Sequence, residues 1–209
     1  MGFLRKWFLL AAVVLLSACS AKSVWAPDDH VQKVQYADPG PAYVTLFTGY
    51  HIKNGRGSHS GLMVSGSERV LFDPAGNFKS DVIAERDDVL FGMNPALVDA
   101  YIDFHTQPKH NATAQTIYVP DDVANNLIAR IKAYGPVPSA MCARSISKVL
   151  KETPGFESLA GTWYPEKLAA QYAELPNVIT HQYAERVGSD GLAYILKWSP
   201  AYRPKYSVK

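Results

Sequence analysis

The chain has 209 residues, enough for one domain of ordinary size with tails and too few for two large domains. Hydrophobic residues make up 47% of it and charged residues 19%, so it can bury a core and global disorder is excluded. The formal charge is +2, from 21 basic and 19 acidic residues. This is far from the basic excess of a dedicated nucleic-acid-binding protein, so no nucleic-acid partner is expected.

The N-terminal residues have the pattern of an export signal. Two basic residues precede an apolar run over residues 7–16, which has the length of a signal-peptide core and is too short to span a bilayer. The next residues complete the sequence Leu-Ser-Ala-Cys, ending at Cys19, which resembles the lipobox of bacterial lipoproteins. The alternative is a plain secretory signal that is cleaved elsewhere.

The lipoprotein resemblance implies a signal peptide over residues 1–18 and a lipid on Cys19, which anchors the protein to the membrane. Ser20, directly after the cysteine, fits sorting to the outer membrane, facing the periplasm of a bacterial cell envelope. Without residues 1–18, the chain has 19 basic and 19 acidic residues, so no attraction to anionic lipid is expected. Cys142 then has no disulfide partner in the chain, and such a thiol is either buried and inert or kept for its reactivity.

The remaining sequence predicts an α+β fold, with an antiparallel β-sheet packed by helices. Residues 19–41 are polar with scattered prolines and predict a tether, followed by a single domain over 42–198 and an irregular tail over 199–209. Short turns join the first three strands into a meander. The expected elements are strands at 43–50, 58–64 and 68–72, a helix after Asn94, a strand at 115–119, helices at 121–135, 139–150 and 166–173, and strands at 178–185 and 193–198.

Cys142 is the first candidate for chemistry. It lies three residues after Ser139, the expected N-cap, and therefore in the first turn of a helix. Free backbone N–H groups and the helix dipole favour a thiolate at this position and could hold a developing oxyanion. Ile146 and Val149 share its helical face, so the alternative is a small buried core residue.

His59 and Asp73 are the candidate partners of this cysteine. His59 lies on the second strand, and a histidine on a sheet facing a cysteine at a helix start can take the thiol proton and later protonate a leaving group. Asp73 ends the neighbouring strand, where a hairpin can bring it beside His59 to fix the imidazole tautomer. The alternatives are a hairpin-edge histidine and an aspartate that only forms a turn before Pro74.

These segments, 59–64 (HSGLMV), 70–74 (VLFDP) and 140–145 (AMCARS), resemble the strand pair and nucleophile helix of NlpC/P60-type thiol peptidases. Here the cysteine helix follows the strands, which resembles the circularly permuted branch of that papain-like superfamily. The branch includes lecithin:retinol acyltransferase-like proteins and several bacterial periplasmic families. The resemblance covers residues 43–76 and 115–155. It implies that Cys142 is the nucleophile, His59 the base and Asp73 the orienting residue.

The resemblance also implies the substrate class, because such proteins cleave amides in cell-wall peptides or move acyl groups. We therefore expect a membrane-anchored cell-envelope cysteine hydrolase or acyltransferase that acts on an amide or ester carbonyl of an envelope peptide or acyl substrate. No cofactor is expected. The alternative is a catalytically inactive envelope lipoprotein that serves as a binding or scaffold module.

Other polar and aromatic residues point less clearly to a function. His105 and His110 are separated by Pro108 and miss the four-residue spacing of two ligands on one helical face, so no metal site is expected although a metal-dependent enzyme is a third reading. His51 could line the same cleft as His59 or be a solvated residue at a strand end. Three aromatic residues could form a substrate-binding rim or belong to the core: Trp163, Tyr164 and Trp198.

Overall fold

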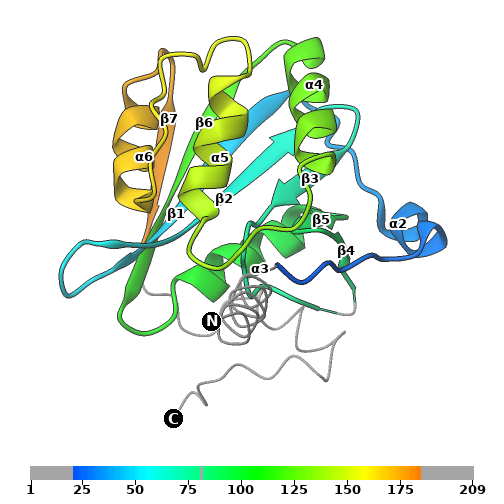
Figure 1. Cartoon of the computed structure of the whole chain (residues 1–209), viewed down its shortest axis with the longest axis horizontal. Coiled ribbons are helices and arrows are strands. Elements are labelled where there is room, and N and C mark those ends of the chain that lie inside the picture. Colours follow the sequence, from blue (N-terminus) through cyan, green and yellow to red (C-terminus); the bar gives the residue numbers. More distant parts are fainter. Residues whose placement is uncertain (1–20, 81, 185–209) are drawn as a thin grey trace, which may run out of the picture.

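The computed structural model describes residues 21–80 and 82–184. Seven strands form one antiparallel sheet in the order β4-β5-β3-β2-β1-β6-β7, and five helices accompany it in the described part of the chain. Figure 1 shows α4, α5 and α6 side by side across one face of this sheet. The expected α+β class with an antiparallel sheet packed by helices is therefore confirmed.

The elements have the following bounds. The strands are β1 Tyr43–His51, β2 Gly57–Ser65, β3 Arg69–Phe72, β4 Ala84–Arg86, β5 Val89–Phe91, β6 His110–Tyr118 and β7 Ile179–Tyr183. The helices are α2 Asp28–Val34, α3 Pro95–His105, α4 Asp121–Lys132, α5 Cys142–Lys151 and α6 Pro165–Ala173. None of the helices in residues 21–80 and 82–184 is long and apolar enough to cross a bilayer.

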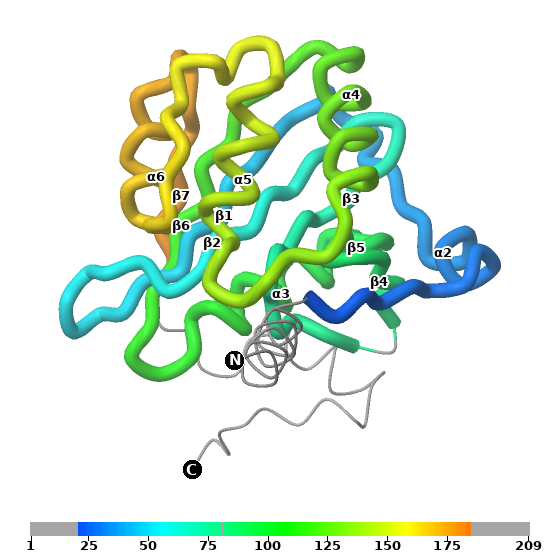
Figure 2. Tube along the Cα trace, viewed as in Figure 1, coloured from blue at the N-terminus to red at the C-terminus, as the bar shows by residue number. Residues whose placement is uncertain are grey.

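Both faces of the central strands are buried, which explains their long apolar runs. Leu46 and Leu62 face α4, α5 and α6 in one core cluster. Phe47 and Met63 point to the opposite face and pack with residues of α3 in a second cluster. The chain trace in Figure 2 follows the meander from β1 through β2 to β3 beneath the three covering helices.

Strand β3 ends early, and this opens one edge of β2. The β2–β3 pairs run only as far as Leu62 and Phe72. The chain then turns at Asp73, where the N–H of Gly76 donates to the Asp73 carbonyl at 2.9 Å, and Pro74 has no N–H with which to continue the ladder. As a result, His59 and Ser60 on β2 lie beyond the end of β3.

Several element boundaries differ from those expected. Strand β6 begins at His110, five residues before the predicted start, and the three-residue strands β4 and β5 were not predicted. The predicted N-cap at Ser139 is wrong. Ala140 has a φ of 64°, which a right-handed helix excludes, so α5 begins at Cys142 with Met141 as its N-cap.

Part of the predicted tether over 19–41 lies against the domain. The Ala26 N–H donates to the Glu85 carbonyl on β4, and the Arg69 N–H donates to the Tyr36 carbonyl, at 2.9 and 2.7 Å. The Arg69 guanidinium forms an ion pair with Asp38. Five predicted features lie outside the described residues: the signal peptide, Cys19, the strand at 193–198, Trp198 and the tail over 199–209.

The ion pair between Arg69 and Asp38 should hold this N-terminal segment in place. Arg69 is buried, and Asp38 is only 22% exposed, so Asp38→Asn leaves a buried guanidinium without its counter-charge. We expect the free energy of unfolding to fall by about 1–3 kcal/mol in urea titrations. Asp28→Asn is the matched control, because Asp28 pairs with Arg86 but is 84% exposed, and its loss should cost less than about 0.5 kcal/mol. Equal losses in the two variants would contradict this account.

Candidate active site

The structure brings His59 and Asp73 into direct contact. His59 on β2 places its Nε2 atom 2.6 Å from Oδ1 of Asp73, in the turn after β3. Asp73 is buried and has two roles. Its backbone carbonyl accepts the hydrogen bond of the turn, and its side-chain carboxylate accepts a hydrogen bond from His59. Because Nε2 is committed to Asp73, Nδ1 is the nitrogen left to face another group.

Cys142 is the first residue of α5 and reaches the open edge of β2. Its sulfur interacts with the His59 ring and accepts hydrogen bonds from the backbone N–H groups of Ser60 and Ala143. The Ser60 N–H is available because β3 ends before it could pair with this part of β2. The sulfur therefore lies where a strand edge and a helix N-terminus both offer donors.

The electrostatics favour a charged pair between these side chains. Burial opposes a charge on His59, but the charge and hydrogen bond of Asp73, with smaller contributions from Cys142, outweigh it and raise the pKa of His59 to about 10. Burial also raises the pKa of the Cys142 thiol, yet the contacts with His59, Ser60 and Ala143 outweigh it and leave that pKa below its usual value. The Cys142 thiolate therefore forms more readily than that of an ordinary cysteine, and it lies opposite an imidazole that is protonated at neutral pH.

Helix α3 adds two residues to this site that sequence reasoning missed. The Tyr101 hydroxyl donates to Oδ1 of Asp73 at 2.7 Å, and the His105 ring lies against that of His59. Gly61 allows this approach, because a Cβ atom there would overlap the Tyr101 hydroxyl. The available signal was the four-residue spacing of Tyr101 and His105, which puts these two polar groups on one face of α3.

Tyr101 also contributes, after His59 and His105, to keeping the orienting carboxylate ionised. Burial raises the pKa of Asp73, but His59, then His105 and the Tyr101 hydroxyl, outweigh it and lower that pKa overall. Burial and the neighbouring Asp73 charge raise the pKa of Tyr101, so it remains a hydroxyl donor at neutral pH. The carboxylate is therefore charged when it receives the bond from His59.

The histidines do not form a metal site in the described part of the chain. His105 packs on His59, whereas His110 on β6 lies opposite His51 on β1, with ring centroids 4.7 Å apart. No group of three or more metal-ligating side chains occurs in residues 21–80 and 82–184. His51 is exposed at the end of its strand.

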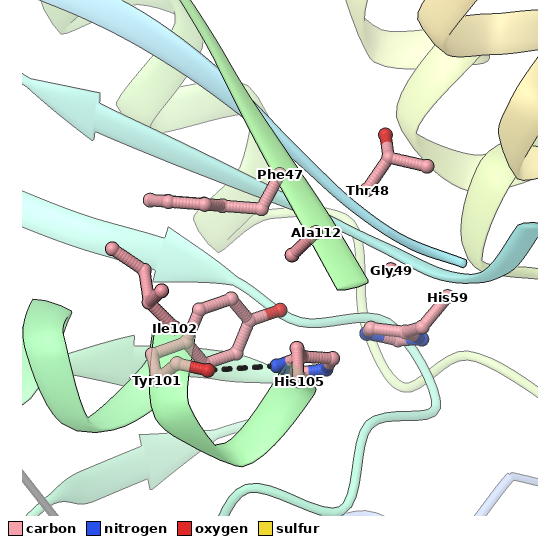
Figure 3. Close-up of a pocket in the computed structure, with 8 residues that line it drawn as sticks. All are labelled: Phe47, Thr48, Gly49, His59, Tyr101, Ile102, His105 and Ala112. Atoms are coloured by element: carbon pink, nitrogen blue, oxygen red, sulfur yellow. Dashed lines mark hydrogen bonds between the residues drawn. The ribbon is translucent and has the colours of Figure 1, made fainter. Parts of the chain in front are cut away.

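A small apolar pocket lies beside His59, between β1 and α3 (Figure 3). It has room for about one water molecule, so it is too small for a substrate. Two of the aromatic residues that could form a substrate-binding rim, Trp163 and Tyr164, are exposed and directly precede α6. That segment is fastened to the start of β2, where the Gly57 N–H donates to the Glu166 carboxylate at 3.0 Å.

Comparisons with models of protein families, with curated proteins and with solved structures found no match. Function is therefore inferred from the side chains themselves. Cys142, His59 and Asp73, predicted as candidates for one site, lie together. A thiolate beside an imidazolium that a carboxylate orients is a set of groups suited to covalent acyl transfer.

Replacing the Tyr101 hydroxyl tests the environment of the carboxylate. Tyr101→Phe removes a hydrogen bond to a buried charge and should lower the free energy of unfolding by about 1.5–3 kcal/mol at pH 7. The pKa of Asp73 is depressed in the folded protein, so this stability is present above the unfolded pKa and disappears as the pH falls through the folded pKa. The difference between Tyr101→Phe and wild type should therefore shrink toward acid in denaturation curves.

Tyr172→Phe provides the control for this experiment. Tyr172 is equally buried, but its hydroxyl donates to the neutral carbonyl of Val44 at 3.0 Å. We expect a smaller loss of about 0.5–1.5 kcal/mol that does not change over the acid range. A pH-independent effect of Tyr101→Phe would show that its hydroxyl does not act on an ionised Asp73.

Proposed function

We propose that this protein is a cysteine hydrolase or acyltransferase that attacks an amide or ester carbonyl. Cys142 is the nucleophile, His59 is the general acid and base, and Asp73 orients the imidazole. The observation that carries this proposal is the 2.6 Å contact between His59 Nε2 and Asp73 Oδ1, which leaves Nδ1 for the Cys142 sulfur. Each contact has the role that nucleophilic catalysis requires of it.

The reaction proceeds in two steps. The Cys142 thiolate attacks the carbonyl carbon, and the carbon–sulfur bond forms as the carbonyl electrons move to oxygen. His59 Nδ1–H then gives its proton to the leaving amine or alcohol, whose bond to carbon breaks and leaves a thioester on Cys142. In the second step, water or an acceptor nucleophile loses a proton to His59 and attacks the thioester, which releases the thiolate.

The first turn of α5 stabilises the charge that develops on the carbonyl oxygen. Helical hydrogen bonding in α5 begins with the Ser145 N–H, which donates to the Met141 carbonyl at 2.9 Å. The preceding N–H groups are free of helical partners and point out of the positive end of the helix dipole. An oxyanion formed at Cys142 lies next to these donors.

The free-energy cost of burying charged and polar side chains at this site supports an enzyme over an inactive binding or scaffold module. Asp73 and Tyr101 are buried, and His59, between Asp73 and Cys142, is held in its charged form by a raised pKa. A fold with only a structural role is often as stable, or more stable, with well-packed apolar residues in place of buried ions. The specific observation that favours the alternative, an inactive binding or scaffold module, is the low exposure of Cys142, at 7%.

The proposal extends to family and location. His59, Asp73 and Cys142 follow one another along the chain on a strand, after the next strand and at a helix start, which supports a permuted NlpC/P60-like, papain-like arrangement. The Leu-Ser-Ala-Cys sequence ending at Cys19 supports a lipid anchor in a bacterial envelope, at the outer membrane facing the periplasm. The substrate is then an envelope peptide amide or an acyl ester.

Trapping of the acyl-enzyme tests the proposed chemistry. We expect purified protein mixed with a p-nitrophenyl ester to release p-nitrophenolate in a burst and to gain the acyl mass on Cys142, located by peptide mass spectrometry. His59→Ala should slow this acylation by about 10²–10⁴-fold, because it removes the proton acceptor and donor. His51→Ala is the matched control and should leave the rate unchanged, since the His51 side chain is exposed at the end of β1 and its ring lies against that of His110. Acylation that continues in Cys142→Ala, or at the same rate in His59→Ala, would refute the proposed function.

A further inference from the structure

His105 packs against His59, on the ring of the proposed catalytic base. It is the last residue of α3, and its ring lies almost parallel to that of His59, with centroids 5.3 Å apart and an interplanar angle of 15°. Figure 3 shows the two rings side by side, with Tyr101 on the same helix as His105. The His105 ring also contacts the rings of Tyr101 and Phe104, which belong to the same helix.

The hydrogen bond of His105 fixes its tautomer. Nδ1 lies 2.9 Å from the backbone carbonyl of Tyr101, which can only accept, so Nδ1 carries a proton and donates it. Burial and the neighbouring charge of His59 lower the pKa of His105 to about 4, so the ring is neutral at physiological pH. Because Nδ1 is committed to a carbonyl, His105 cannot pass a proton onward from His59.

The surroundings of His59 leave one face of its ring for this contact. Asp73 takes Nε2, Cys142 meets the ring from α5, and His105 covers a face from α3. Gly49, directly opposite His59 on β1, lies next to the His105 ring, since a Cβ atom there would be in van der Waals contact with His105 Cδ2 at 3.6 Å. Asp73 and His110 on β6 are further titratable groups that act on His105.

We propose that His105 is a positioning residue, whose neutral aromatic face holds the His59 ring in the plane set by Asp73 and stabilises its protonated form opposite the Cys142 thiolate. This inference rests on the proposed function. A neutral aromatic ring carries negative charge density on its face, so it attracts a cation stacked on it, and the attraction is larger where water is excluded. It also blocks rotation of the imidazole away from Cys142. His105 therefore acts through His59, whose ring it contacts.

Two substitutions separate the aromatic face from the hydrogen bond. His105→Phe keeps a flat ring and loses the N–H donor, whereas His105→Gln keeps a donor for the Tyr101 carbonyl and loses the aromatic ring. The measurement is the pH titration of thiolate absorbance near 240 nm in the full chain, with the Cys142→Ser spectrum subtracted to isolate Cys142. We expect the midpoint to stay within about 0.3 pH units of wild type in His105→Phe and to rise by about one unit in His105→Gln.

Controls make the outcomes distinct. His110→Gln changes the neighbouring histidine on β6, which does not stack on His59, and should leave the midpoint in place. A midpoint unchanged in folded His105→Gln, or raised in His105→Phe but not in His105→Gln, would overturn the role of the aromatic face. His59→Ala is titrated in parallel. If the thiolate midpoint is unchanged in His59→Ala as well, the proposed catalytic pair is refuted. If the midpoint rises in His59→Ala but not in His105→Gln, only the role of His105 is rejected.

Discussion

Asp73 is the residue on which the geometry of the site depends. Its backbone N–H donates to the Asp88 carbonyl at 2.8 Å, which holds the end of β3 against the turn before β5. One oxygen of its side chain accepts hydrogen bonds from both His59 and Tyr101, at 2.6 and 2.7 Å. A single buried carboxylate thus connects β2, β3 and α3. It also determines which imidazole nitrogen is left for Cys142.

The cysteine is brought to this carboxylate through a second aspartate. Asp88 accepts from the Ala75 N–H with one oxygen, at 3.2 Å, and from the Val137 N–H with the other, at 2.7 Å. Ala75 belongs to the turn that carries Asp73, and Val137 lies in the loop that leads to α5. The start of α5 is therefore held at the edge of β2 that the short β3 leaves open. The turn that carries Asp73 and the loop that leads to Cys142 are far apart in the sequence, but both are held to Asp88 by these hydrogen bonds.

Local patterns in the sequence predicted much of this arrangement, and distant contacts account for what they missed. The meander and the pairing of His59 with Asp73 follow from β-branched runs and short turns, which act over a few residues. The start of α5 was misplaced because Ser139 has the chemistry of an N-cap, whereas the left-handed Ala140 delays the helix. The contact of His105 with His59 depends on how α3 docks beneath the sheet, and no local pattern encodes that docking. The catalytic roles of the three predicted residues stay predictions.

The pH dependence of Cys142 alkylation tests the central claim most directly. With iodoacetamide and peptide mapping, we expect rapid labelling of folded protein well below the free-thiol pKa of about 8.5, because His59 and the N–H groups of Ser60 and Ala143 stabilise the thiolate. His59→Ala should move the labelling profile to higher pH, since burial then raises the thiol pKa with less to oppose it. Labelling of Cys142 that occurs only on unfolding, or a profile that His59→Ala leaves unchanged, would contradict the account and identify Cys142 as a buried structural residue.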